Sequence, residues 1–185
     1  MEHLRRHCGF TLFETLVVLI ILAITLSTGI PAFRNMQENV LARNKTSEIE
    51  RLIAFARYEA ITTQQRVTLC PIDRHGSCHA DWNAELTVFT DSNNNRTLDD
   101  SERTLKSLPA KVEEIVERDF NNRAISFNHK GFSGTYAGSF SLCVNGSKKR
   151  GSAMIISRMG KIRYGTDRNG DGLPELPNGD NIPCS

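Results

Sequence analysis

The sequence has almost no net charge, and it lacks the residue patterns that indicate catalysis. Its 185 residues include 23 Lys and Arg against 21 Asp and Glu, a formal charge of +2 at pH 7. The net charge is therefore too small to attract nucleic acid to the protein as a whole, and only a local cluster of positive charge could bind DNA. The chain also lacks a phosphate-cradling glycine loop, a nucleophile motif and paired acids at an identifiable cleft. We therefore expect a protein that is not an enzyme.

Charge is scarcest over residues 10–30, where Glu14 is the one charged side chain. As a helix this stretch reaches roughly 30 Å, the thickness of the hydrocarbon core of a membrane. A secretory signal peptide would place small residues at a cleavage site after the apolar run, but residues 31–34 read Pro-Ala-Phe-Arg. Arg5 and Arg6 precede the run and favour a cytoplasmic start. We therefore predict a retained single-pass anchor with the C-terminal domain facing outward.

A charged Glu14 near the start of such a helix is unfavourable in free energy. A carboxylate carried to the centre of a bilayer helix costs about 2.5–3.5 kcal/mol. An ion pair offsets this cost only when a second subunit, or the chain's own terminus, supplies an amine. The alternative is that Glu14 extends to the membrane interface and remains hydrated.

The chain contains five cysteines. Cys8 precedes the apolar run, and four lie beyond it: Cys70, Cys78, Cys143 and Cys184. An even number there fits an oxidising compartment and two disulfides. Of the three possible pairings we favour Cys70–Cys78 with Cys143–Cys184, which would contribute about 2.6 and about 4 kcal/mol in the loop-entropy model; the longer bridge would also hold a tail rich in Gly, Pro and Asn. The alternative is a zinc site made of Cys70, His75, Cys78 and His79, although their spacing is not that of a known finger.

Beyond the apolar stretch, the pattern predicts one amphipathic helix followed by short strands. Pro31 is expected to break or kink the helix locally. Apolar residues then recur at helical spacing until about Gln64; they are Leu41, Ile49, Leu52, Ile53, Ala56 and Ala60. From Arg66 onward the pattern predicts strands at residues 67–72, 85–90, 103–108, 112–117, 124–128, 139–144, 152–157 and 161–164. Antiparallel hairpins covered by the helix would form an α+β fold.

The N-terminal stretch Gly9-Phe10-Thr11-Leu12-Phe13-Glu14 resembles the prepilin signature of type IV pilins and type II secretion pseudopilins. The resemblance implies that a prepilin peptidase cuts after Gly9 and methylates the new amino group of Phe10. It also implies that Glu14 neutralises the N-terminal amine of a neighbouring subunit during filament assembly.

Later stretches narrow the resemblance to the GspH/FimT class; they are residues 69–71, Trp82, and residues 88–102, 125–131 and 156–163. The class implies a cleaved leader at 1–9, a transmembrane assembly helix at 10–30, an amphipathic helix at 31–65 and a periplasmic β-rich domain at 66–185. The implied partners are other pilins, prepilin peptidase and the inner membrane. The implied function is that of a minor pilin of a type IV pilus, in its initiation or tip complex. The alternatives are a GspH-like pseudopilin of type II secretion and a DNA-binding pilin for natural transformation.

Basic residues gather between Gly146 and Arg168, where Asp167 is the only acid. They are Lys148, Lys149, Arg150, Arg158, Lys161, Arg163 and Arg168. Contact with phosphates would give salt-sensitive, sequence-blind binding to double-stranded DNA. Some FimT-like pilins bind DNA through a Gly-Arg-x-Arg motif. Residues 160–163 match it, with Lys161 retaining the charge but not the bidentate fork of arginine. A solvated hairpin, or contact with an acidic neighbouring pilin, is the alternative.

Two stretches resemble calcium loops, although we expect no bound cofactor. The ligand positions of the first hold Asp91, Asn93, Asn95, Thr97, Asp99 and Glu102. Arg96 stands where the loop requires glycine, and Asn and Asp also favour hairpin loops. The second, partial pattern is Asp167, Asn169, Asp171, Gly172 and Glu175.

Overall fold

One long helix opens the described chain, which covers residues 11–110 and 116–184 of this computed structural model. The helix α1 (Leu12–Thr63) runs through Pro31 without interruption, so of the predicted break or kink, the break does not occur. Proline has a φ compatible with a helix and removes one N–H donor, which a long helix can tolerate. The chain divides into two units, Met1–Glu38 and Asn39–Ser185, and α1 contributes to both.

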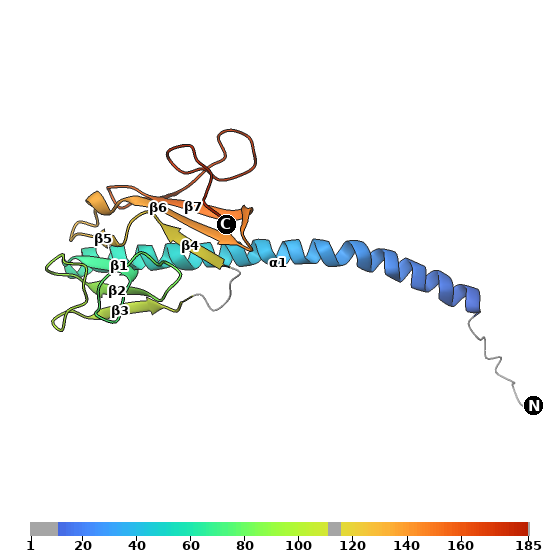
Figure 1. Ribbon diagram of the computed structural model, residues 1–185, viewed down its shortest axis with the longest axis horizontal. Helices are drawn as coiled ribbons and strands as arrows, with labels where there is room; N and C mark the ends of the chain where they lie inside the picture. The colour runs from blue at the N-terminus through green and yellow to red at the C-terminus, as the bar shows by residue number, and fades with distance from the viewer. Residues whose placement is uncertain (1–10, 111–115, 185) are drawn as a thin grey trace, which may run out of the picture. The chain divides into compact units, whose positions relative to one another are not determined.

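The second unit contains two antiparallel four-stranded sheets within the described residues. The first has the order β3-β2-β1-β5 and consists of β1 (Val67–Pro71), β2 (Leu86–Thr90), β3 (Thr104–Leu108) and β5 (Ile125–Phe127). The second has the order β4-β6-β7-β8 and consists of β4 (Val116–Phe120), β6 (Gly138–Val144), β7 (Ser147–Ile156) and β8 (Ile162–Tyr164). A short 3₁₀ helix, η1 (Gly134–Tyr136), lies between β5 and β6. Figure 1 shows both sheets against the part of α1 that belongs to this unit.

The core lies where the second half of α1 meets both sheets. Every residue of the predicted apolar stripe from Ile49 to Ala60 is buried, and Leu41 is half-buried against the same cluster. Trp82 anchors the core, with its ring 5.2 Å from that of Phe120 and 5.7 Å from that of Phe140, both edge to face. The predicted α+β fold, one long helix packed on antiparallel sheets, is confirmed.

Two strands differ from their predicted positions. Strand β4 is described from Val116 to Phe120 and so extends three residues past its predicted end at residue 117; the predicted start, residues 112–115, lies outside the described part of the chain. Strand β7 begins at Ser147, five residues earlier than predicted. In both strands charged residues lie inside the observed bounds, where an apolar pattern would have marked them; these residues are Glu117, Arg118 and Asp119 in β4 and Lys148, Lys149 and Arg150 in β7.

Candidate assembly segment and surface sites

Glu14 lies in the first turn of α1, and its side chain is exposed. Its backbone N–H donates to Thr11 Oγ1 at 3.2 Å, and the N–H of Thr15 donates to the Thr11 carbonyl oxygen, also at 3.2 Å. Thr11 therefore acts as the N-cap of the helix. A carboxylate in this first turn also faces the positive end of the helix dipole. The Thr-x-x-Glu spacing of a capping box could have identified Thr11 from the sequence. The predicted processing residues Gly9 and Phe10 lie outside the described residues.

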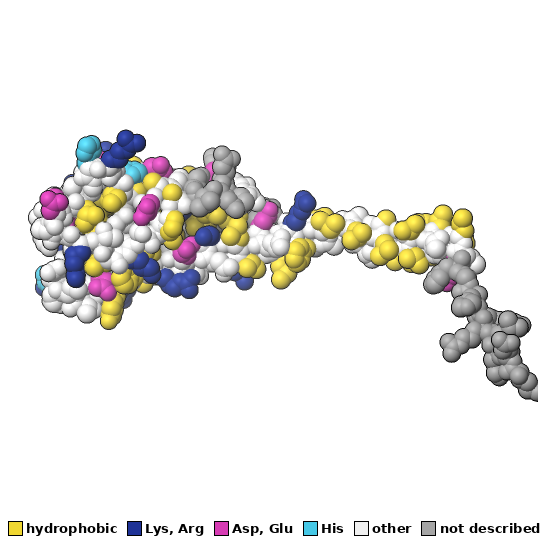
Figure 2. All heavy atoms as spheres, turned by 90° about the horizontal axis from the view of Figure 1, so that it is seen from below, with side chains coloured by type: hydrophobic (Ala, Val, Ile, Leu, Met, Phe, Trp, Pro, Cys, Tyr) yellow, Lys and Arg dark blue, Asp and Glu magenta, His cyan; other side chains and the backbone are white. Residues whose placement is uncertain are grey.

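The part of α1 that follows Glu14 within the first unit exposes apolar side chains to solvent, as Figure 2 shows. Leu19 is 66% exposed, for example. The few hydroxyl groups donate to backbone carbonyls of the preceding turn, Thr15 to Leu12 and Ser27 to Ile24, each at 2.8 Å. Such bonds leave little polar surface on the helix. In the described part of the chain, α1 is the one helix long and apolar enough to cross a membrane, judged by length and composition.

Two disulfides join the cysteine pairs favoured from the sequence. Cys70 and Cys78 have a Cα–Cα distance of 5.6 Å, and Cys143 and Cys184 one of 5.8 Å. A sulfur held in a disulfide is not the thiolate that zinc requires, so the alternative zinc site is wrong. Cys143 also packs with Ile182 in a small buried cluster, so the end of the tail is held on β6.

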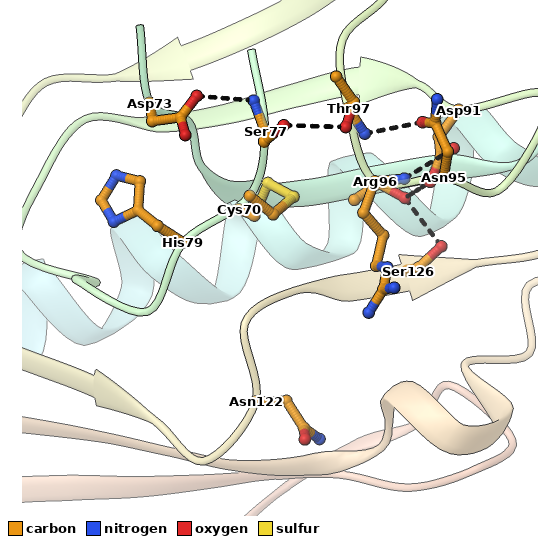
Figure 3. Close-up of a disulfide and its surroundings, with 12 residues drawn as sticks. Cys70, Asp73, Ser77, His79, Asp91, Asn95, Arg96, Thr97, Asn122 and Ser126 are labelled. Atoms are coloured by element: carbon orange, nitrogen blue, oxygen red, sulfur yellow. Dashed lines mark hydrogen bonds between the residues drawn. A yellow bond between two sulfur atoms is a disulfide. The ribbon is translucent and has the colours of Figure 1, made fainter. Parts of the chain in front are cut away.

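The loop of residues 91–102, which we call the Asp91 loop, is held by hydrogen bonds among its own residues and by one from Thr68 on β1. Asp91 is buried at the end of β2 and accepts hydrogen bonds from Thr68 Oγ1 at 2.6 Å and from the Arg96 N–H at 3.4 Å. Figure 3 shows Asp91, Asn95 and Arg96 on one side of the Cys70 disulfide. Asn95 Oδ1 accepts from the Thr97 N–H at 2.8 Å, a typical Asx turn.

The other candidate calcium ligands of this loop also bond within it. Asn93 and Asn95 both donate through Nδ2 to Asp99 Oδ2 at 2.8 Å. Glu102 Oε1 accepts from the Ser92 N–H at 2.8 Å. The geometry is that of a hydrogen-bonded hairpin loop. Among the described residues there is no group of three or more His, Cys, Asp or Glu side chains that could hold a metal ion.

The second calcium-like pattern forms a similar turn in the tail. Asp167 accepts from the N–H groups of Gly170 and Gly172, at 2.7 and 2.8 Å. Asn181 Nδ2 donates to Asp171 Oδ2 at 3.1 Å. This bond, followed by one from the Leu173 N–H, lowers the pKa of Asp171 below its ordinary value.

The predicted DNA-binding residues occupy one strand, the turn after it and the next strand. Lys148, Lys149 and Arg150 belong to β7; Arg158 and Lys161 are exposed on the β7–β8 turn, and Arg163 is exposed on β8. The structure therefore brings Arg158 and Lys161 together, but it does not unite the whole set in one element. On the face that Figure 2 shows, basic and acidic side chains are intermixed over the second unit.

Two further basic residues join the β7–β8 turn through tertiary contacts. The Arg158 carbonyl accepts from the N–H groups of Ser133 and Gly134 at 3.1 and 3.0 Å. Arg57 Nε on α1 donates to the Gly131 carbonyl at 3.0 Å, and a Cβ at Gly160 would overlap that same carbonyl oxygen. We call the resulting group the Arg57 surface; it consists of Arg57, Lys130, Arg158 and Lys161. Arg57 and Lys130 were missed because residues so distant in sequence meet only in the folded domain.

An apolar N-terminal helix that continues into a domain of antiparallel sheets is the architecture of type IV pilin-like proteins. A model of the prokaryotic N-terminal methylation motif matches residues 4–30, which include the predicted cleavage site and Glu14. A model of the family described as type II transport protein GspH matches residues 45–160. The chain therefore belongs to the GspH/FimT family of type IV pilin-like proteins. Its members are structural subunits of the pilin or pseudopilin type, which assemble with other pilins and are processed by prepilin peptidase.

Two solved structures are similar to this chain. The type IV minor pilin FimU of Pseudomonas aeruginosa is 16% identical; the match covers 70% of this chain and 91% of that chain, with a TM-score of 0.53. The minor pseudopilin EpsH from the type 2 secretion system of Vibrio cholerae is 13% identical, with 66% and 94% covered and a TM-score of 0.47. Comparison with curated protein sequences finds no match. Because FimU is only 16% identical to this chain, the similarity shows a shared fold and nothing more.

Proposed function

We propose that the chain is a minor pilin that enters a type IV pilus through its N-terminal helix and takes part in initiating the pilus or forming its tip. The observation that carries this proposal is the exposed apolar helix with Glu14 in its capped first turn. In a filament, packing between subunits would cover the apolar surface, and an amine from a neighbour would neutralise Glu14. The domain would lie in the periplasm, an oxidising compartment in which both disulfides can form.

Replacing Glu14 tests this role. Glu14→Gln removes the charge but retains the shape of the side chain, so we expect assembled pili in sheared surface fractions to fall at least tenfold. Thr11→Ala is the matched control, because it removes the N-cap and leaves the carboxylate. If T11A reduces assembly as strongly as E14Q, the loss does not depend on the carboxylate in particular, and the test no longer supports the proposed ion pair. Normal assembly of E14Q would also contradict it.

A GspH-like role in type II secretion is the alternative, supported by the family model that matches most of the domain. Deleting the gene and scoring twitching, DNA uptake and protein secretion together separates the two. We expect loss of twitching with secretion intact. Loss of secretion alone would establish the pseudopilin role instead.

DNA binding is a second candidate function, favoured by the Arg57 surface. Arg158 and Lys161 are exposed there with Lys130, and Arg57 lies beside them. Replacing Arg158 and Lys161 with Gln should weaken mobility shifts of double-stranded DNA at low salt, because each lost cation removes one phosphate contact. Lys106→Gln is the control, because Lys106 is exposed on β3, at the opposite edge of the first sheet from β5, after which Lys130 follows in the chain. Equal binding by wild type and the double variant would exclude this site.

We also propose that the domain works without a bound cofactor. The Asp91 and Asp167 loops already use their carboxylates as acceptors for their own N–H and amide groups. Calcium at millimolar concentration should therefore leave the melting temperature unchanged. A rise that Asp99→Asn removes would identify the Asp91 loop as a calcium site.

A further inference from the structure

A cavity of about 380 Å³ lies within the second unit, between α1 and the strands β3, β4 and β6. Its walls are mainly apolar; they include Leu41 and Ile49 on α1, Leu108 at the end of β3, Val116 on β4 and Leu142 on β6. The volume is in the range of pockets that bind small molecules. An apolar wall alone would not define a ligand, so the polar side chain in the cavity decides what it could bind.

That side chain is Arg118, which lies two residues after Val116 on β4 and opposite Leu142 on β6. Successive side chains of a strand alternate between its faces, so Val116 and Arg118 share the face that lines the cavity. Arg118 is only 7% exposed. Arginine is among the residues least often buried without a partner of opposite charge.

The hydrogen bonds of Arg118 leave its guanidinium incompletely satisfied. Nη2 donates to the carbonyls of Asn83 and Ala84 at 3.0 and 3.1 Å. Nε is buried and has no hydrogen-bond partner within the described residues. Buried N–H groups without partners are rare in folded proteins.

No carboxylate in the described chain forms an ion pair with this guanidinium. Glu48 also lines the cavity, but its Oε2 is 3.0 Å from Lys45 Nζ in the single ion pair found among those residues. Burial lowers the pKa of Arg118, while the negative charges of Glu48 and Asp81 act in the opposite direction. The cavity therefore combines an apolar wall with a buried cation that has no direct counter-ion among the described residues.

We propose that this cavity binds a small amphiphile consisting of one carboxylate on a hydrocarbon chain, with the carboxylate at Arg118 and the chain against Leu41, Ile49 and Leu142. Charge complementarity selects an anion, since a neutral or cationic head would leave the guanidinium unpaired. The apolar wall selects a hydrocarbon body. This inference goes beyond assembly and does not depend on which filament the chain enters.

Octanoate and octanamide are matched probes, because they have nearly the same shape and differ in charge. The full chain is reconstituted in lipid nanodiscs, and the ¹⁵N–¹H signal of the Arg118 Nε–H is followed during titration; Arg118→Lys identifies the signal by its loss. We expect octanoate to move this signal saturably and to bind at least tenfold more tightly than octanamide. Ala110→Phe places a ring at an exposed position of the cavity lining and should abolish the shift. Ser107→Phe adds the same ring to an exposed position of β3 outside the lining and should not.

Three results would overturn the proposal. The first is an Arg118 signal that octanoate does not move, which would mean that the guanidinium is satisfied within the chain. The second is equal affinity for octanoate and octanamide, which would exclude recognition of charge. The third is octanoate binding that A110F leaves intact, which would place the probe elsewhere, such as in the lipid. If R118K does not fold, the octanoate–octanamide comparison and the A110F–S107F pair still decide the outcome.

Discussion

Tyr164 connects β8 to α1 through a single hydrogen bond from its hydroxyl to Glu50. Burial, together with the bond to Glu50 and the charge of Glu50, raises the pKa of Tyr164 to about 12. The folded state therefore holds the phenol proton more tightly than the unfolded state, whose tyrosine titrates near 10. The stability from this group is complete below about pH 10 and is lost as the pH rises towards 12.

Glu50→Gln should lower the pKa of Tyr164, because it removes the negative charge that opposes phenolate formation while retaining an acceptor. Titration of phenolate absorbance in the near ultraviolet measures this shift. Tyr164→Phe is the control that identifies which of the three tyrosines is responsible. A titration curve unchanged by E50Q would mean that burial alone sets the pKa.

The two disulfides close chain segments of different lengths, so the contribution of each to stability can be compared with the other. Cys143–Cys184 closes a separation of 41 residues, and Cys70–Cys78 one of 8. Replacing Cys143 and Cys184 with Ser should cost about 4 kcal/mol of unfolding free energy, against about 2.6 kcal/mol for the shorter bridge. Chemical denaturation of both double variants measures the difference. The C143S/C184S variant should also become sensitive to proteolysis within residues 165–184; a tail that stays protected would show that its packing around Ile182 is sufficient.

Elements with a clear apolar pattern could be predicted from the sequence, whereas the bounds of strands with inward or clustered charges could not. The stripe from Ile49 to Ala60 has the period of a helix, and the cores of β1, β2 and β6 are short apolar runs, so each appeared near its predicted place. Arg118 made β4 look polar, although its side chain is buried. The cavity beside Arg118 forms only when α1 packs on strands that are distant in sequence, so no local pattern predicts it. The same holds for the approach of Arg57 to the β7–β8 turn.

At the scale of the whole molecule, the two units rely on different interactions for their stability. All buried hydrophobic residues identified in the described chain belong to residues 49–182, within the second unit. The first unit instead exposes its apolar side chains. The second unit thus contains its own core and both disulfides, so its folding should not require the assembly helix.

Residues 39–185, exported to the periplasm without the first unit, should therefore fold on their own. We expect one cooperative thermal transition, both disulfides formed and a monomer in solution, because the apolar surface that drives assembly has been removed. The full chain in nanodiscs should unfold its domain at nearly the same temperature, and E14Q should not change that temperature. A truncated domain that aggregates or lacks a cooperative transition would contradict this division, since part of the core would then have to come from residues 11–38. Agreement would mean that loss of assembly in E14Q reflects a missing contact between subunits rather than a damaged domain.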